Sequence, residues 1–286
     1  MNMSEALSSP GKSIPWFQIF KYTVYSLLCI NTVFFFQEEY AASAFMFSNG
    51  INFSQMIEAY SATIDTASWV VLLLVFEMET HVISDEKLHG LLKAGLNGLK
   101  GLCYVFILYA LYGYISTYTS LLNFESSAVT ELCSMAGQSF SFMTTLDEFV
   151  PIASEGCLGL SNSTQFFELP GTTILADAET LKLAQNLAMI DVINATTWVC
   201  LVFILTIDIW LQMKEELTDK MMKVSTYIKA VIYLILIACA VFWGIDGKFI
   251  DFWDAFLWIV AFFFIEMNLF EWHAEVEERV GHHDVA

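Results

Sequence analysis

The sequence predicts an all-α polytopic membrane protein with six transmembrane helices, and three observations lead to this fold class. The chain is 57% hydrophobic and only 15% charged, whereas soluble domains carry about 25% charged residues. Several stretches reach about 20 apolar residues, the length that crosses a hydrocarbon core of roughly 30 Å. When these stretches are taken as spans, lysine and arginine also fall mostly on one side of the membrane. The cytoplasmic loops of membrane proteins are enriched in these residues in the same way.

The apolar stretches define the spans and their order. They lie at residues 16–37, 64–83, 99–121, 187–211, 224–244 and 251–272. The polar start lacks the basic region and short apolar core of a cleavable signal, so we expect the first span to be retained. The segment at 85–102 carries leucines on one helical face. It is either an amphipathic helix on the membrane surface or an extension of the third span.

The basic residues orient the chain with both termini in the cytoplasm. Ten of the twelve lysines and arginines fall on the side of the N-terminus, and only Lys182 and Lys248 fall on the other. Because cytoplasmic loops are enriched in these residues, the protein is expected to be N-in and C-in in the cell membrane. The opposite side is acidic, which accounts for part of the net charge of −19. This acidic side is either a solvated outer face or a surface that concentrates cations.

The chain is therefore expected to have two membrane blocks separated by an extracytoplasmic domain. Cys133 and Cys157 are the only cysteines outside the predicted spans, so an oxidising outer compartment favours a disulfide between them. The predicted divisions are a cytoplasmic tail at 1–15, three spans at 16–121 with an outer insertion at 38–63, the extracytoplasmic domain at 122–186, three spans at 187–272 and a cytoplasmic tail at 273–286.

The spans share an internal pattern that suggests three two-helix hairpin repeats. The odd spans begin with Lys-x-x-x-Tyr, at Lys21–Tyr25, Lys100–Tyr104 and Lys229–Tyr233. The even spans carry a polar residue four before a tryptophan, at Asp65–Trp69, Asn194–Trp198 and Asp254–Trp258. Glu77 and Glu266 each follow their tryptophan by eight residues, whereas Glu79 and Asp208 follow theirs by ten. Internal repeats are common in transport proteins, whose sites often lie between repeats.

Charged residues at the inner ends of the spans form the first candidate site. At 1.5 Å per residue, the lysines and acids of each hairpin reach a similar depth. An unpaired charge there is costly, so we expect ion pairs, with Glu77 facing Lys21 or Lys100. The pairs are either purely structural or also guard an ion path. The candidates are Glu77, Glu79, Asp208, Glu266, Lys21, Lys100 and Lys229.

Aspartates at the outer ends of the even spans form the second candidate site. Asp65, Asp191 and Asp254 would lie at the outer mouth of a route lined by these spans. Rings of acidic side chains favour cations. The alternative is that Asp65, Asp191 and Asp251 cap helix N-termini, where aspartate suits the helix dipole.

Other chemistry has little support in the sequence. Glu77 and His81 share a helical face and form a metal-site candidate that would need ligands from another helix. All five histidines lie at or beyond the predicted cytoplasmic span ends, which disfavours haem. The sequence has no G-x-S-x-G motif. We therefore expect neither a cofactor nor enzymatic activity.

The sequence favours an integral membrane ion channel or channel-like transporter for cations. The alternative is a non-catalytic structural or accessory subunit that docks in a larger membrane complex through residues 122–186. Either function implies the lipid bilayer as a partner, together with a homo-oligomer or partner membrane subunits, and no nucleic acid.

Overall fold

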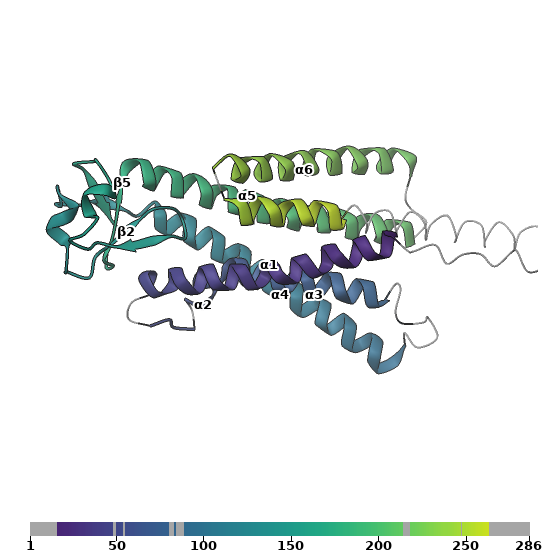
Figure 1. Cartoon of the computed structure of the whole chain (residues 1–286). Helices are drawn as coiled ribbons and strands as arrows, with labels where there is room; N and C mark the ends of the chain where they lie inside the picture. The colour runs from purple at the N-terminus through teal and green to yellow at the C-terminus, as the bar shows by residue number, and fades with distance from the viewer. Residues whose placement is uncertain are drawn as a thin grey trace, which may run out of the picture.

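The computed structural model describes residues 16–47, 50–53, 55–79, 83, 89–213, 218–246 and 248–262. Most of them are helical. The helices are α1 (Trp16–Met46), α2 (Met56–Ala59), α3 (Ser61–Glu77), α4 (Gly90–Leu121), α5 (Ala178–Met213) and α6 (Asp219–Ile245). A further helix covers residues 249–262. Figure 1 shows the long helices running along one bundle, with a small sheet at one end.

Among the described residues, four helices are long and apolar enough to cross a membrane, which agrees with the predicted helical membrane protein. These candidate spans are Gln18–Met46, Gly90–Leu121, Ala178–Asp208 and Lys220–Ile245. They correspond to the first, third, fourth and fifth predicted spans. Helix α3 covers most of the second, and residues 251–262 of the sixth are described.

Two helices are longer than predicted. Helix α4 begins at Gly90, so the described part of the 85–102 segment extends the third span and forms no separate surface helix. Helix α5 begins at Ala178, before the expected start of the fourth span. Polar residues such as Glu179 and Lys182 can occupy the added start of α5 because Leu181, in the same turn, packs against the sheet.

The prediction of an all-α fold is wrong for the segment between α4 and α5. It contains β1 (Glu125–Ser126), β2 (Ser141–Met143), β3 (Phe149–Pro151), β4 (Phe166–Glu168) and β5 (Ile174–Asp177), with short 3-10 helices at Leu132–Met135 and Cys157–Gly159. The strand order is β1-β4-β5-β2-β3, in which only the β2–β5 pair is parallel. Strands of two to four residues are too short for a clear period-2 pattern.

The sheet has an apolar core on each side. One core includes Phe142, Ile152 and Phe166 and is joined by the predicted Cys133–Cys157 disulfide, which the structure confirms. The other includes Met143 and Ile174 and packs on the ends of α4 and α5. The second core fixes the sheet to the end of the bundle.

A separate core fills the middle of the helix bundle. It joins α1, α3, α4, α5, α6 and the helix at 249–262 through buried side chains such as Leu28, Leu73, Leu201 and Leu236. These four side chains are at most 4% exposed. In the part of the chain that the structure describes, the centre of the bundle is therefore filled by packed apolar side chains.

Gly113 allows α4 to approach the α2–α3 corner closely. A Cβ atom there would lie 2.6 Å from Ser61 Oγ and 2.8 Å from the Ile57 carbonyl oxygen. Gly113→Ala should therefore lower the free energy of unfolding by about 1–3 kcal/mol, the usual cost of overpacking. Thermal unfolding of the detergent-purified protein measures this change.

The matched control is Gly101→Ala on the same helix, where an added Cβ meets no atom within 4 Å. Alanine has the higher helix propensity, so this variant should be neutral or more stable by up to about 1 kcal/mol. Equal losses in the two variants would show that close packing at Gly113 is unimportant.

Candidate functional site

An acidic cavity of about 140 Å³ lies where the sheet meets the helix bundle. Its wall includes side chains of all the labelled helices, of the β2–β3 turn and of the helix at 249–262. Among the described residues its lining contains a single lysine, Lys248, and eight acids. The acids are Glu38, Glu39, Glu58, Asp65, Asp147, Asp191, Asp251 and Asp254. This excess of negative charge is the most unusual feature of the described structure.

A cluster of aromatic side chains closes the cavity on the side of the bundle core. The ring centroids of Trp198 and Trp258 each lie 6.4 Å from that of Trp69. Phe262 lies 4.7 Å from Trp198 and 6.2 Å from Trp69. All four side chains are at most 8% exposed. We call these four residues the tryptophan cluster.

The residues one helical turn before each tryptophan line the cavity. They are Asp65 on α3, Asn194 on α5 and Asp254 on the helix at 249–262. The indoles of Trp69 and Trp258 are hydrogen-bond partners of the carboxylates four residues before them. The three polar residues therefore form the floor of the cavity, directly beside the tryptophan cluster.

Only some of the polar atoms at the cavity floor have hydrogen-bond partners. Asn31 Nδ2 donates to Asp254 Oδ1 at 3.0 Å, and the Tyr114 hydroxyl lies 3.5 Å from Asp65 Oδ2. Asn194 Oδ1 is buried and accepts no hydrogen bond from the described residues. Buried polar atoms normally have a partner, so this oxygen is an unsatisfied acceptor among the described residues.

Glu39 has a structural role in the cavity wall. Its carboxylate accepts hydrogen bonds from the backbone N–H groups of Ala62 and Thr63, at 2.7 and 3.0 Å, and from the Thr63 hydroxyl at 2.6 Å. These N–H groups belong to the first turn of α3, where the helix itself offers them no acceptor. Glu39 on α1 thus caps α3 from outside and fixes the two helices together.

Lys248 holds two acids from distant parts of the chain. Its Nζ lies 3.3 Å from Glu38 Oε1 on α1 and 3.7 Å from Asp147 Oδ2 in the β2–β3 turn. Burial raises the pKa of Asp147 to about 6, although the nearby Lys248 opposes this rise. Burial by itself would lower the pKa of Lys248, but the carboxylates of Asp147 and Glu38 outweigh it and raise that pKa. Lys248 is therefore a firmly charged ammonium inside the cavity.

Glu58 on α2 is the remaining lining acid outside the six predicted spans. Burial raises its pKa, and a hydrogen bond from Ser116 opposes that effect. A carboxyl group in such a position is more easily protonated than an exposed one.

The inner-end lysines and acids form three ion pairs at the other end of the bundle. Lys21 Nζ lies 2.7 Å from Glu77 Oε1, and the two side chains are only 2% and 5% exposed. The Tyr22 hydroxyl also donates to Glu77, at 2.9 Å. Lys100 lies 3.0 Å from Glu79, so of the two predicted partners of Glu77 the structure selects Lys21.

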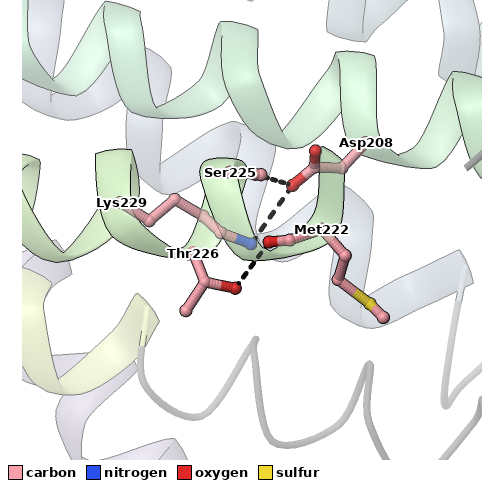
Figure 2. Close-up of polar contacts among 5 residues, drawn as sticks. All are labelled: Asp208, Met222, Ser225, Thr226 and Lys229. Atoms are coloured by element: carbon pink, nitrogen blue, oxygen red, sulfur yellow. Dashed lines mark hydrogen bonds and ion pairs between the residues drawn. The ribbon is translucent and has the colours of Figure 1, made fainter. Parts of the chain in front are cut away.

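The third pair joins α5 and α6. Lys229 Nζ lies 3.2 Å from Asp208 Oδ2, which also accepts a hydrogen bond from the Ser225 hydroxyl (Figure 2). Thr226, on the same turn, donates instead to the Met222 carbonyl oxygen of its own helix. None of the three ion pairs lines the acidic cavity.

The predicted outer-mouth aspartates all line the acidic cavity. The capping alternative is wrong for Asp65 and Asp191, because α3 begins at Ser61 and α5 begins at Ala178. Both aspartates therefore lie within helices, and both line the cavity. Asp251 does lie in the first turn of its helix, which begins at residue 249.

The metal candidate cannot be completed from the described residues. Glu77 is occupied by Lys21 and Tyr22, and His81 lies outside the described residues, as does Glu266. Within the described ranges, no group of three or more His, Cys, Asp or Glu side chains could hold a metal ion.

Sequence reasoning missed the contributions of Glu38, Glu39, Asp147 and Lys248 to the cavity. Their positions along the chain carry no common motif, and they meet only because the β2–β3 turn folds back against α1. The threefold polar-x-x-x-Trp pattern was the available signal, since it marks both the floor and the tryptophan cluster.

Comparisons with family models, with characterised proteins and with solved structures find no match for this chain. The functional argument therefore rests on the geometry and charge of the acidic cavity.

Proposed function

We propose that this protein is an integral membrane cation channel or channel-like transporter whose outer vestibule is the acidic cavity. The observation that carries the proposal is the lining of eight acids and one lysine above a closed aromatic cluster. Clefts lined by one sign of charge concentrate counter-ions, and rings of acids select cations. The tryptophan cluster would act as the constriction between the vestibule and the inner side.

The proposed topology has six spans, with both termini in the cytoplasm and residues 122–186 outside the cell membrane. The first halves of α1, α4 and α6, which carry Lys21, Lys100 and Lys229, lie toward one end of the bundle, and the disulfide-bonded sheet lies at the other (Figure 1). Disulfides persist in oxidising compartments, and lysines favour the cytoplasmic side. Both features support the same orientation, in which the acidic cavity opens outward.

The proposed three-hairpin repeat also receives support from the cavity. Of the three tryptophans that share a position in the repeat, Trp198 and Trp258 each contact Trp69, and the polar residues one turn before them share one floor. Transporter sites commonly lie where internal repeats meet. In the proposed repeat, the equivalent residues would therefore surround one central axis.

Potassium uptake into liposomes tests the proposed function. Purified full-length protein should catalyse uptake well above that of protein-free liposomes, and an anion tracer should be excluded. The absence of any cation flux, together with co-purification of a stable membrane partner, would instead support an accessory subunit.

The tryptophan cluster should limit the flux. Trp258→Ala removes a large side chain that is 6% exposed and contacts both Trp69 and Phe262. Potassium uptake should rise about ten-fold or more, which corresponds to a barrier lowered by about 1.4 kcal/mol. Trp258→Phe, which keeps part of the volume, should give an intermediate rate.

The control for this variant is Trp16→Ala, because Trp16 is 71% exposed and lies far from the cavity lining. Its flux should match that of the unaltered protein. Size-exclusion chromatography verifies that each variant is folded. Unchanged flux in folded Trp258→Ala protein would mean that the cluster is no constriction.

A further inference from the structure

We infer that the acidic cavity binds a small primary alkylammonium ion, with its ammonium group beside Asn194, Asp65 and Asp254 and its alkyl chain against the tryptophan cluster. This inference rests on the proposed cation-binding role of the cavity and specifies the class of cation. Four observations carry it.

The first observation concerns charge. The lining is strongly acidic, yet no group of three or more acids among the described residues is arranged to hold a metal ion. A bare divalent ion needs six or more oxygen ligands at short distances. A larger, more diffuse cation can instead be stabilised by carboxylates that surround it without converging on one point.

The second observation concerns size. A cavity of about 140 Å³ is close to the 150 Å³ of an engineered apolar cavity that binds benzene, a ligand of six non-hydrogen atoms. The acidic cavity therefore has room for an organic ion of about five or six non-hydrogen atoms. An alkali ion would leave most of this space to water.

The third observation concerns the floor. Asn194 Oδ1 is a buried acceptor that no described donor satisfies, and it lies one turn before Trp198. A primary ammonium has three N–H donors, so one can satisfy Asn194 while the others reach the Asp65 and Asp254 carboxylates. A quaternary ammonium has no N–H to donate. The aromatic side chains next to this floor suit the alkyl chain, and rings also attract organic cations.

The fourth observation is that the cavity already holds an alkylammonium of its own. The Lys248 side chain is a primary amine on a four-carbon chain, and its ammonium pairs with Glu38 and Asp147 in the cavity wall. This side chain is only 11% exposed. The same lining chemistry therefore accepts a buried primary ammonium at a second position.

Binding of n-butylammonium to the full-length, detergent-purified protein tests this inference. Tetramethylammonium has the same number of non-hydrogen atoms but no N–H donor, sodium has charge alone, and n-butanol has the alkyl chain alone. Thermal unfolding is followed as each probe is titrated at constant ionic strength. n-Butylammonium should raise the melting temperature. Its half-saturating concentration should be about ten-fold or more below that of tetramethylammonium or sodium, because a buried hydrogen bond contributes a free energy of about this ratio in affinity. n-Butanol should have no effect.

Two variants identify the floor as the binding site. Asn194→Ala and the isosteric Asp254→Asn should each weaken n-butylammonium binding about ten-fold or more. Glu155→Gln, which neutralises an exposed acid in the sheet domain outside the cavity, should leave it unchanged. Equal affinities for n-butylammonium and tetramethylammonium, or binding that is insensitive to Asp254→Asn, would overturn the inference.

The outcome is separable from that of the proposed function. Potassium uptake that depends on the cavity acids, without preferential n-butylammonium binding, would overturn the alkylammonium inference and leave cation transport standing. Preferential n-butylammonium binding without any cation flux would support a binding protein for amines and contradict transport.

Discussion

Replacing Lys21 by methionine should lower the free energy of unfolding by about 3–5 kcal/mol, the largest stability loss that we expect from a single change. Glu77 would remain buried, at 4% exposure, after losing its 2.7 Å ion pair with Lys21. The hydrogen bond from Tyr22 supplies a donor but no opposite charge. Unfolding of the purified protein in mixed detergent micelles measures the loss.

The double variant Lys21→Met, Glu77→Leu should recover most of this stability, because apolar side chains of similar volume often replace a buried ion pair without loss. The matched control is Lys229→Met, whose pair with Asp208 has side chains that are 23% and 22% exposed. Partial exposure weakens an ion pair, so this change should cost about 1 kcal/mol or less. Similar losses in Lys21→Met and Lys229→Met would contradict the distinction between the two pairs.

Neutralising the cavity floor should reduce cation flux about ten-fold or more. The variant is Asp65→Asn combined with Asp254→Asn, which keeps side-chain volume and the hydrogen bond that Asn31 donates to residue 254. A carboxylate about 6 Å from a cation stabilises it by about 3 kcal/mol at an effective dielectric constant of 20, and that loss alone corresponds to more than ten-fold. Potassium uptake into liposomes, measured beside the unaltered protein, gives the ratio.

Glu155→Gln provides the matched control, because it removes an acid of the sheet domain that does not line the cavity. Its flux should be unchanged. If the floor variant and the control transport equally well, the floor aspartates do not act on the permeating ion.

The helical architecture was predictable because long apolar runs have few alternatives. Lys21 and Glu77 illustrate how far such reasoning extends, since helical rise alone matched their depths and the structure brings them within 2.7 Å. The choice between Lys21 and Lys100 as the partner of Glu77 depended on helix rotation. Sequence spacing does not define that rotation, and packing determined it.

The acidic cavity could be predicted only in part. Asp65, Asp191 and Asp254 were recognisable because they interrupt apolar runs, and all three line the cavity. Asp147 and Glu38 were not recognisable from the sequence, because they reach the cavity only through the β2–β3 turn and the extended end of α1. Short strands and long-range contacts of this kind are set by tertiary packing rather than by local propensity.

The reversal potential of the reconstituted full-length protein under a potassium chloride gradient tests most directly whether the acidic cavity selects cations. The proposed vestibule predicts a reversal potential near that of potassium, which shifts toward zero when Asp65 and Asp254 are both replaced by asparagine. A reversal potential near that of chloride, or one that the floor variant leaves unchanged, would contradict the proposal.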